Sequence, residues 1–189
     1  MEEGLSEQET LVKKCRSGNP LAQHILYDRY AVSMYNVSLR ILGNTGEAED
    51  VLQNSFIQAF KKIDGLESNE MFGSWLKRIV VNHSIDALRK RKIKFISLDA
   101  NDIEIEVWEE PPSFFDEKPK KEVIKKIQNG IKQLPEGYKT VINLYLFEGY
   151  DHSEISEILG ISESTSRSQY IRAKKKLRKI LNNNSKVNF

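Results

Sequence analysis

Residues 151–181 read DHSEISEILGISESTSRSQYIRAKKKLRKIL, a stretch whose spacing predicts two short helices separated by a tight turn. Asp151 and Glu154 form a D-x-x-E capping box, which marks the start of the first helix. Gly160 supplies the left-handed residue that ends this helix, and Ser162 can cap the second one. Six basic residues then fall within eight consecutive positions of the second helix. Two helices joined in this way are typical of a helix-turn-helix.

The outer face of the second helix carries side chains that suit DNA. Arginine reads guanine through paired donors, glutamine reads adenine, and an aliphatic side chain can touch the methyl group of thymine. Lysines further along the helix suit phosphate oxygens, which position a helix without reading sequence. A surface helical hairpin with solvated lysines is the simpler alternative. The predicted DNA-facing residues are Ser164, Thr165, Arg167, Ser168, Gln169, Ile171, Arg172, Lys175 and Lys176, while Tyr170, Ala173 and Leu177 are predicted to face inward.

Charge is unevenly distributed along the 189 residues, although the net charge is only +2. Eight acidic residues and no basic residue lie within 99–117, between basic blocks at 89–94 and 172–179. Such blocks suggest polyanionic partners, although solvated helix ends would give a similar pattern. Turn signals separate segments of helical spacing on both sides of the acidic stretch. We therefore predict an all-α protein with two small helical domains, 1–95 and 119–185, joined by an acidic flexible linker at 96–118.

Several classes of protein are disfavoured by composition. No apolar run approaches the ~20 residues of a membrane span, and no hydrophobic signal segment follows Met1, so we expect a cytoplasmic protein. Cys15 is the only cysteine, which excludes an internal disulfide and a cysteine-rich metal site. The three histidines are scattered, and no glycine-rich phosphate loop is present. We expect no catalytic residue, no cofactor, no metal and no small-molecule substrate.

Three longer segments resemble a known family. AEDVLQNSFIQAFKKID at 48–64 and MFGSWLKRIVVNHSIDALRKRK at 71–92 resemble region two of bacterial sigma factors. LPEGYKTVINLYLFEGYDHSEISEILGISESTSRSQYIRAKKKL at 134–177 resembles region four. The order of the segments, and the absence of other sigma regions, match the small extracytoplasmic-function (ECF) group.

The resemblance implies a sigma factor, which directs core RNA polymerase to promoters and is not an enzyme. The helix-turn-helix would read the minus-thirty-five element, and the N-terminal domain would open the minus-ten element. Asn82 matches the position near the pocket for a flipped base, whereas Trp75 is more readily explained as a core residue. The matching minus-ten residues are Trp75, Lys77, Arg78, Asn82, Arg89 and Arg91, and the matching residues for binding the polymerase clamp are Asp50, Gln53, Asn54 and Phe56.

The family also implies partners. These are core RNA polymerase, through its clamp coiled coil and its flap, promoter DNA, and an anti-sigma factor that in many relatives is membrane-bound. The chain departs from the family at Ser166, where a branched aliphatic is common, and at Gln169, where arginine is common. The alternative is a stand-alone helix-turn-helix regulator that binds duplex as a dimer, but the chain shows no separate sensor domain and no obvious dimer helix.

Overall fold

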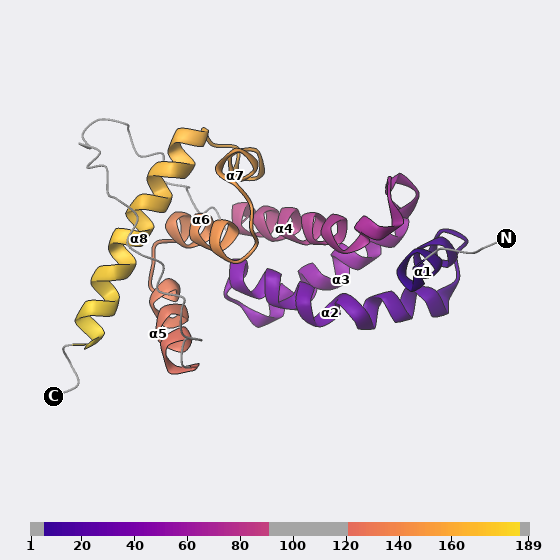
Figure 1. The fold of residues 1–189 in the computed structure, drawn as a ribbon, viewed down its shortest axis with the longest axis horizontal. Coiled ribbons are helices and arrows are strands. Elements are labelled where there is room, and N and C mark those ends of the chain that lie inside the picture. The colour runs from indigo at the N-terminus through magenta and orange to yellow at the C-terminus, as the bar shows by residue number, and fades with distance from the viewer. Residues whose placement is uncertain (1–5, 91–120, 186–189) are drawn as a thin grey trace. The chain divides into compact units, whose positions relative to one another are not determined.

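The computed structural model describes residues 6–90 and 121–185, which form helices and short turns without a strand among them (Figure 1). The chain divides into two compact units, Met1–Ile93 and Lys94–Phe189. The predicted all-α class is confirmed for these residues. The predicted linker, 96–118, and the basic residue Arg91 lie outside the described residues, so their predicted roles are not addressed by the structure.

The helices of the first unit begin and end at the residue types that favour helix ends. Ser6 and Glu9 form a reciprocal capping box at the start of α1. The Asn19 side chain accepts a hydrogen bond from the backbone N–H of Ala22 at 3.1 Å, and Gly43 ends α2 with a left-handed φ of 67°. The elements are α1 (Glu7–Arg16), α2 (Pro20–Leu42), α3 (Thr45–Lys61), the 3-10 turns η1 (Ile63–Gly65) and η2 (Asn69–Met71), and α4 (Phe72–Lys90).

The core of the first unit lies where α2, α3 and α4 pack against one another. Phe72 is fully buried at the start of α4, and its ring contacts Tyr30 of α2 with a centroid distance of 5.5 Å. Gly73 allows this close approach, since a Cβ atom there would lie 2.9 Å from the Tyr30 ring. The other fully buried side chains of this core include Leu26, Ile41, Leu76, Val80, Ile85 and Leu88.

The second unit packs three helices against one long helix, α8. Ile131, Leu134, Ile142 and Ala173 form its buried centre. Gly130 lets α5 approach α8, because a Cβ atom at this position would lie 2.7 Å from Leu177 Cδ1. The elements are α5 (Lys121–Lys132), α6 (Glu136–Leu146), α7 (His152–Leu159) and α8 (Glu163–Ser185).

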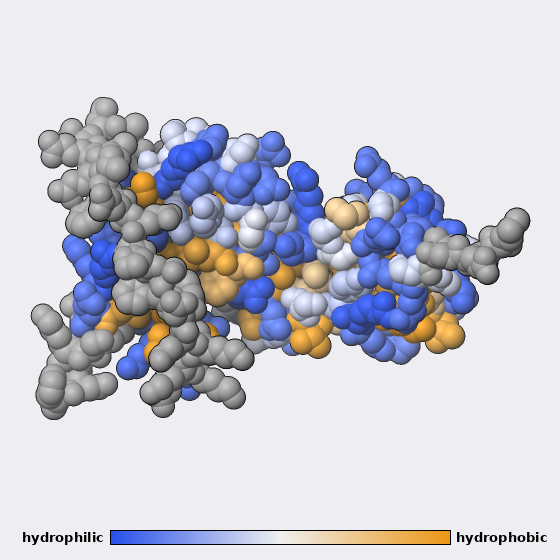
Figure 2. Space-filling model, viewed as in Figure 1, coloured by the Kyte–Doolittle hydropathy of each residue, from blue (hydrophilic) through white to orange (hydrophobic). Residues whose placement is uncertain are grey.

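Hydrophilic residues cover most of the surface visible in Figure 2, with hydrophobic residues exposed in smaller areas. The exposed hydrophobic side chains include Val32 and Ile57 in the first unit and Leu146 and Ile171 in the second. None of the helices in the two described ranges has the length and apolar character needed to cross a membrane.

Candidate nucleic-acid interface

The predicted helix-turn-helix is present as α7 and α8. The Asp151 side chain accepts a hydrogen bond from the backbone N–H of Glu154 at 2.8 Å, and the Glu154 carboxylate accepts one from the Asp151 N–H at 2.9 Å. Gly160 ends α7 in the left-handed conformation, with φ of 67° and ψ of 38°. The Ser162 hydroxyl accepts a hydrogen bond from the backbone N–H of Thr165 at 3.1 Å, as expected for a helix cap. The capping box, the glycine turn and the second cap are therefore confirmed.

The outer face of α8 is polar and basic. Ser164, Arg167 and Ser168 are exposed near its start, and Ile171 adds an aliphatic side chain that is 51% exposed. Thr165 and Arg172 are partly exposed. Lys175 and Lys176 are exposed one to two turns further along the helix. Eight of the nine predicted DNA-facing residues therefore have at least partly exposed side chains on α8.

Gln169 is the ninth predicted residue, and its predicted placement is wrong. Its side chain is only 2% exposed and lies beneath α8, facing the start of α6. A Cβ atom on Gly137 would lie 3.5 Å from Gln169 Oε1, so the glycine makes room for the amide. Ser166, Gln169 and Ala173 are three and four residues apart, so the helical repeat places them in one inward row. A buried amide in this row cannot read a base from the outer face.

Glu163, at the first position of α8, is a functional candidate that was not predicted from the sequence. Its carboxylate accepts a hydrogen bond from the Arg167 guanidinium, and both side chains are substantially exposed. The four-residue spacing of an acid and a base on a helix is the signal that could have revealed this pair. The leading arginine of the basic face is therefore held along the helix by a carboxylate on the same face.

Two aromatic rings and a histidine meet behind the turn. The imidazole of His152 stacks on Tyr145 of α6 with centroids 4.7 Å apart, and Tyr145 also contacts Tyr170 of α8 at 4.5 Å. Lys174 Nζ lies 4.6 Å from the centroid of the Tyr170 ring, a cation–π contact. This cluster joins α6, α7 and α8.

The second set of predicted DNA-binding residues lies on α4. Asn82, Arg78 and Arg89 are exposed, and Lys77 is partly exposed. Arg89 donates to the Asp86 carboxylate at 3.0 Å. Trp75 is partly buried beside Phe72, with ring centroids 6.1 Å apart, which agrees with its interpretation as a packing residue. One face of α4 therefore offers an amide and several cations to solvent.

The segment before α4 is held by α1. Gln8 Nε2 donates to the carbonyl oxygen of Glu70 at 2.8 Å. The Arg16 guanidinium donates to the Leu66 carbonyl oxygen and, at 3.1 Å, to Asn69 Oδ1. Hydrogen bonds from a neighbouring helix thus fix the backbone that leads into α4.

The predicted polymerase-facing residues lie on α3, and one of the four is misplaced. Asp50, Gln53 and Asn54 are exposed along one stripe. Phe56 is only 3% exposed, and its ring contacts Tyr27 with a centroid distance of 4.8 Å, so it belongs to the core and cannot face a partner. Ile57, which is 52% exposed, continues the stripe at a step of three from Asn54. It was missed because aliphatic residues are normally assigned to a core.

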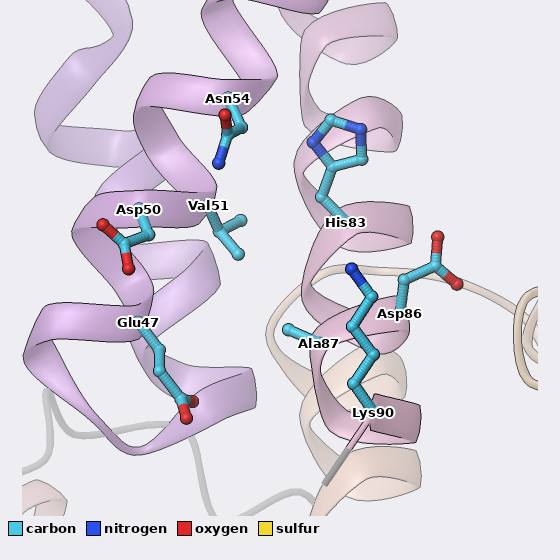
Figure 3. A pocket seen from close by; sticks show the side chains of 8 residues that line it. All are labelled: Glu47, Asp50, Val51, Asn54, His83, Asp86, Ala87 and Lys90. Carbon is cyan, nitrogen blue, oxygen red and sulfur yellow. The ribbon is translucent and has the colours of Figure 1, made fainter.

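A polar pocket lies between α3 and α4, beside this stripe (Figure 3). Its lining includes His83, whose Nδ1 lies 3.0 Å from Ser55 Oγ and whose Nε2 contacts Gln58 Oε1. Burial lowers the pKa of His83, and Lys62 and Lys90 lower it further while Asp86 opposes them. The histidine thus links α4 to α3. The lining residues are Glu47, Asp50, Val51 and Asn54 of α3 with His83, Asp86, Ala87 and Lys90 of α4.

Comparisons with known proteins agree with this architecture. Residues 26–93 match the family model described as Sigma-70 region 2, and residues 124–177 match the model described as Sigma-70, region 4. The ECF RNA polymerase sigma factor SigW of Bacillus subtilis (strain 168) is 34% identical over 177 residues, which cover 90% of this chain and 94% of that protein. The chain belongs to the ECF sigma factor family.

More distant relatives support the same family. The ECF RNA polymerase sigma-E factor of Escherichia coli (strain K12) is 28% identical over 180 residues, covering 92% of this chain and 93% of that protein. A solved structure of the sigma factor RpoE from Bartonella quintana, in complex with the anti-sigma factor NepR, has a TM-score of 0.53 and 20% identity. It covers 87% of this chain and 98% of that one, and it shows the shared fold.

The chain is thus a sigma factor that acts in promoter-directed initiation of transcription with RNA polymerase. The region-two match spans most of α2 together with α3 and α4, and the region-four match includes α6, α7 and α8 as far as Leu177. Sigma factors as a family are not enzymes. These relatives give no support to the alternative of a stand-alone regulator.

Proposed function

We propose that α8 of this sigma factor reads the minus-thirty-five element in the major groove. The single observation that carries this assignment is the exposed face around Arg167, which presents a guanidinium, two hydroxyl groups and an aliphatic side chain near the helix start. These groups suit base edges, whereas cations further along a docked helix suit phosphates. In this proposal Ser164, Thr165, Arg167, Ser168 and Ile171 face bases, and Arg172, Lys175 and Lys176 face phosphates.

The first unit opens and holds the minus-ten element. The exposed amide of Asn82 offers both a donor and an acceptor to the edge of a flipped base. Lys77, Arg78 and Arg89 give the same helix a cationic surface that can follow separated strands without reading their sequence. Base flipping costs a few kcal/mol, so a prepared polar site must offset the lost stacking. Arg91 belongs to this set by sequence alone, and Trp75 supports the helix from beneath.

The exposed stripe of α3 binds the clamp of core RNA polymerase. Asp50, Gln53 and Asn54 supply its polar contacts, and Ile57 takes the apolar role that the sequence had suggested for Phe56. A partly hydrophobic centre with a polar rim is the usual composition of a protein interface. The second unit binds the flap in the same proposal.

The remaining features follow from family membership. Residues 96–118 connect two domains, 1–95 and 119–185, so that both promoter elements can be bound at once. An anti-sigma factor holds the protein inactive, as the complex of RpoE with NepR suggests by analogy. The protein works in the cytoplasm and carries no catalytic activity of its own.

The direct experiment adds the purified chain to core RNA polymerase that lacks any sigma factor. Linear templates randomised at the minus-thirty-five and minus-ten positions serve as probes, because the preferred promoter need not be known in advance. We expect transcripts that start at a subset of templates sharing two separated sequence elements. Transcripts that start equally from all templates, or no transcripts at all, would contradict the proposed function.

A further inference from the structure

His152 is the first residue of α7, but its side chain is shared among three helices. Its ring lies flat on Tyr145 of α6, at 4.7 Å and 21°, and presents an edge to Tyr170 of α8 at 5.6 Å and 62°. Its Nδ1 lies 2.9 Å from the hydroxyl oxygen of Ser166, also on α8. One imidazole therefore fixes the position of α7 relative to both of its neighbours.

Ser166 is the residue of α8 whose hydroxyl group meets the His152 ring. The residue is fully buried, and a buried hydroxyl group is costly unless it is hydrogen-bonded. Its hydroxyl oxygen meets His152 Nδ1 at hydrogen-bonding distance. The small side chain of Ser166 makes fewer van der Waals contacts than a branched aliphatic side chain would make here. The hydrogen bond to His152 therefore supplies part of the interaction that holds α8 in place.

Because α8 is a continuous helix, the hydrogen bond at Ser166 also fixes the side chains on the outer face of the helix. Arg167 follows Ser166 in sequence, and 100° of helical rotation turns its side chain to solvent, where it is 63% exposed. A rotation or shift of α8 beneath Ser166 would therefore displace the guanidinium by a similar amount. Reading a base edge through two hydrogen bonds tolerates little displacement.

We propose that His152 is a positioning residue for base reading, which acts through Ser166 to hold the first turns of α8 in register with the DNA. The inference rests on the proposed role of α8 at the minus-thirty-five element. His152 itself touches neither base nor phosphate in this proposal. Its contribution is the orientation of the side chains that do.

The surroundings of the ring favour this role. Burial lowers the pKa of His152, and Arg167 and Lys174 of α8 lower it further, whereas Glu163 and Asp151 oppose them. The lowered pKa favours the neutral imidazole, and the neutral ring stacks on Tyr145. A neutral ring also adds no charge beside Arg167.

Two substitutions separate the hydrogen bond from the ring contacts. His152→Asn keeps a polar group near the position of Nδ1, and His152→Phe keeps the stacking but removes the hydrogen bond. Ser166→Ala removes the hydroxyl group from the other side of the pair. The double variant His152→Phe with Ser166→Ala completes a double-mutant cycle, and Ser33→Ala in the first unit controls for loss of an unrelated hydroxyl group.

Each full-length variant is assayed with core RNA polymerase on the randomised templates described above. We expect His152→Phe and Ser166→Ala each to reduce discrimination at minus-thirty-five positions by about fivefold, with minus-ten discrimination unchanged. The double variant should lose no more than the worse single variant, and His152→Asn should stay within about twofold of wild type. Thermal unfolding shows whether each variant is folded at the assay temperature.

Three results would overturn the proposal. The first is that His152→Phe discriminates among minus-thirty-five bases as well as wild type does. The second is that the double variant loses discrimination by the product of the two single losses. The third is that discrimination falls equally at the minus-thirty-five and minus-ten elements. Arg167→Ala, measured in parallel, tests the role of α8 separately from the role of His152. If Arg167→Ala relaxes minus-thirty-five preference and His152→Phe does not, only the role of His152 fails. If neither relaxes it, the assignment of α8 fails as well.

Discussion

The carboxylate of Glu163 holds the guanidinium of Arg167 one turn further along the exposed face of α8. Because Arg167 is the leading candidate for reading a base, its partner in the free protein is a negative charge on the surface that approaches DNA. Binding a base edge requires the arginine to leave this pair or to share it. Breaking the pair therefore costs free energy whenever Arg167 contacts DNA, and the interaction with the correct base must offset this free energy.

Glu163→Gln is expected to raise affinity for all promoter sequences and to reduce discrimination among them. Removal of the carboxylate releases Arg167 and takes a negative charge away from the DNA phosphates. An exposed ion pair contributes about 0–1 kcal/mol, so the affinity change should be at most about fivefold. Competition binding of the reconstituted holoenzyme to preferred and scrambled promoters measures both quantities.

The matched control for this substitution is Glu7→Gln. Glu7 pairs with Arg29 at 2.6 Å in the first unit, so the control breaks a comparable ion pair away from α8. A gain in affinity from Glu7→Gln of the same size would show that the effect is one of total charge. Unchanged or sharper discrimination in Glu163→Gln would contradict the prediction.

Lys176→Ala is expected to weaken binding to all promoters by a similar factor. A lysine that contacts a phosphate releases about one counterion on binding, so its loss should reduce the slope of log affinity against log salt by about one. Titrations of holoenzyme with duplex at several salt concentrations measure this slope. Lys13→Ala, on α1, is the control. A loss confined to one promoter sequence would assign Lys176 to base reading instead.

Phe56→Ala and Ile57→Glu should separate folding from partner binding. Phe56 is buried against Tyr27, so its truncation should destabilise the first unit by about 3–5 kcal/mol in urea unfolding. Ile57 is half exposed, so Ile57→Glu should leave stability nearly unchanged while weakening the complex with core polymerase. If Ile57→Glu unfolds the protein, or binds polymerase as tightly as wild type does, the assignment of the α3 stripe is wrong.

The stability of the first unit should depend on pH through His83. Burial lowers the pKa of His83 below its ordinary value of 6.5, so the unfolded chain binds this proton more readily than the folded one does. The contribution of His83 to the free energy of unfolding is therefore fully present above pH 6.5. It is lost as the pH falls from 6.5 through the pKa of His83 in the folded protein. His83→Gln should show a flatter decline between pH 7.5 and 5.5.

Urea unfolding followed by the fluorescence of Trp75 measures this dependence. The chain has two tryptophans, and Trp108→Phe in both proteins leaves Trp75, on α4, as the reporter of the first unit. Carboxylates and other histidines contribute equally to the two proteins, so the difference belongs to His83. Parallel pH profiles, or a steeper one for His83→Gln, would contradict the assigned direction.

Local signals predicted much of this structure because they act over three or four residues. The Asp151 capping box, the Gly160 turn and the Ser162 cap each depend on neighbouring residues, and all three are present. The inward row of Tyr170, Ala173 and Leu177 follows from the same helical period. Family resemblance then supplied the order of the domains and the class of partner.

The misplaced residues depend on contacts that are distant in sequence. Gln169 lies one turn before Ala173 in the inward row, but only Gly137, thirty-two positions earlier, leaves space there for an amide, and no local rule reveals that space. Phe56 and Ile57 are adjacent apolar residues, and only the position of α2 decides that Phe56 meets Tyr27 while Ile57 faces solvent. Such predictions therefore fail at a polar residue on the inward side of a helix, and at adjacent apolar residues on the border between core and surface.

The central claim is that α8 and α4 read separate promoter elements, and one measurement tests it most directly. Wild type, Arg167→Ala and Asn82→Ala are each combined with core RNA polymerase on the randomised templates, and base preference is measured at every position. Arg167→Ala should cost about 1–3 kcal/mol at preferred minus-thirty-five positions alone, and Asn82→Ala should relax preference at minus-ten positions alone. If both substitutions alter the same positions, or each weakens all templates equally, the two helices do not read separate elements.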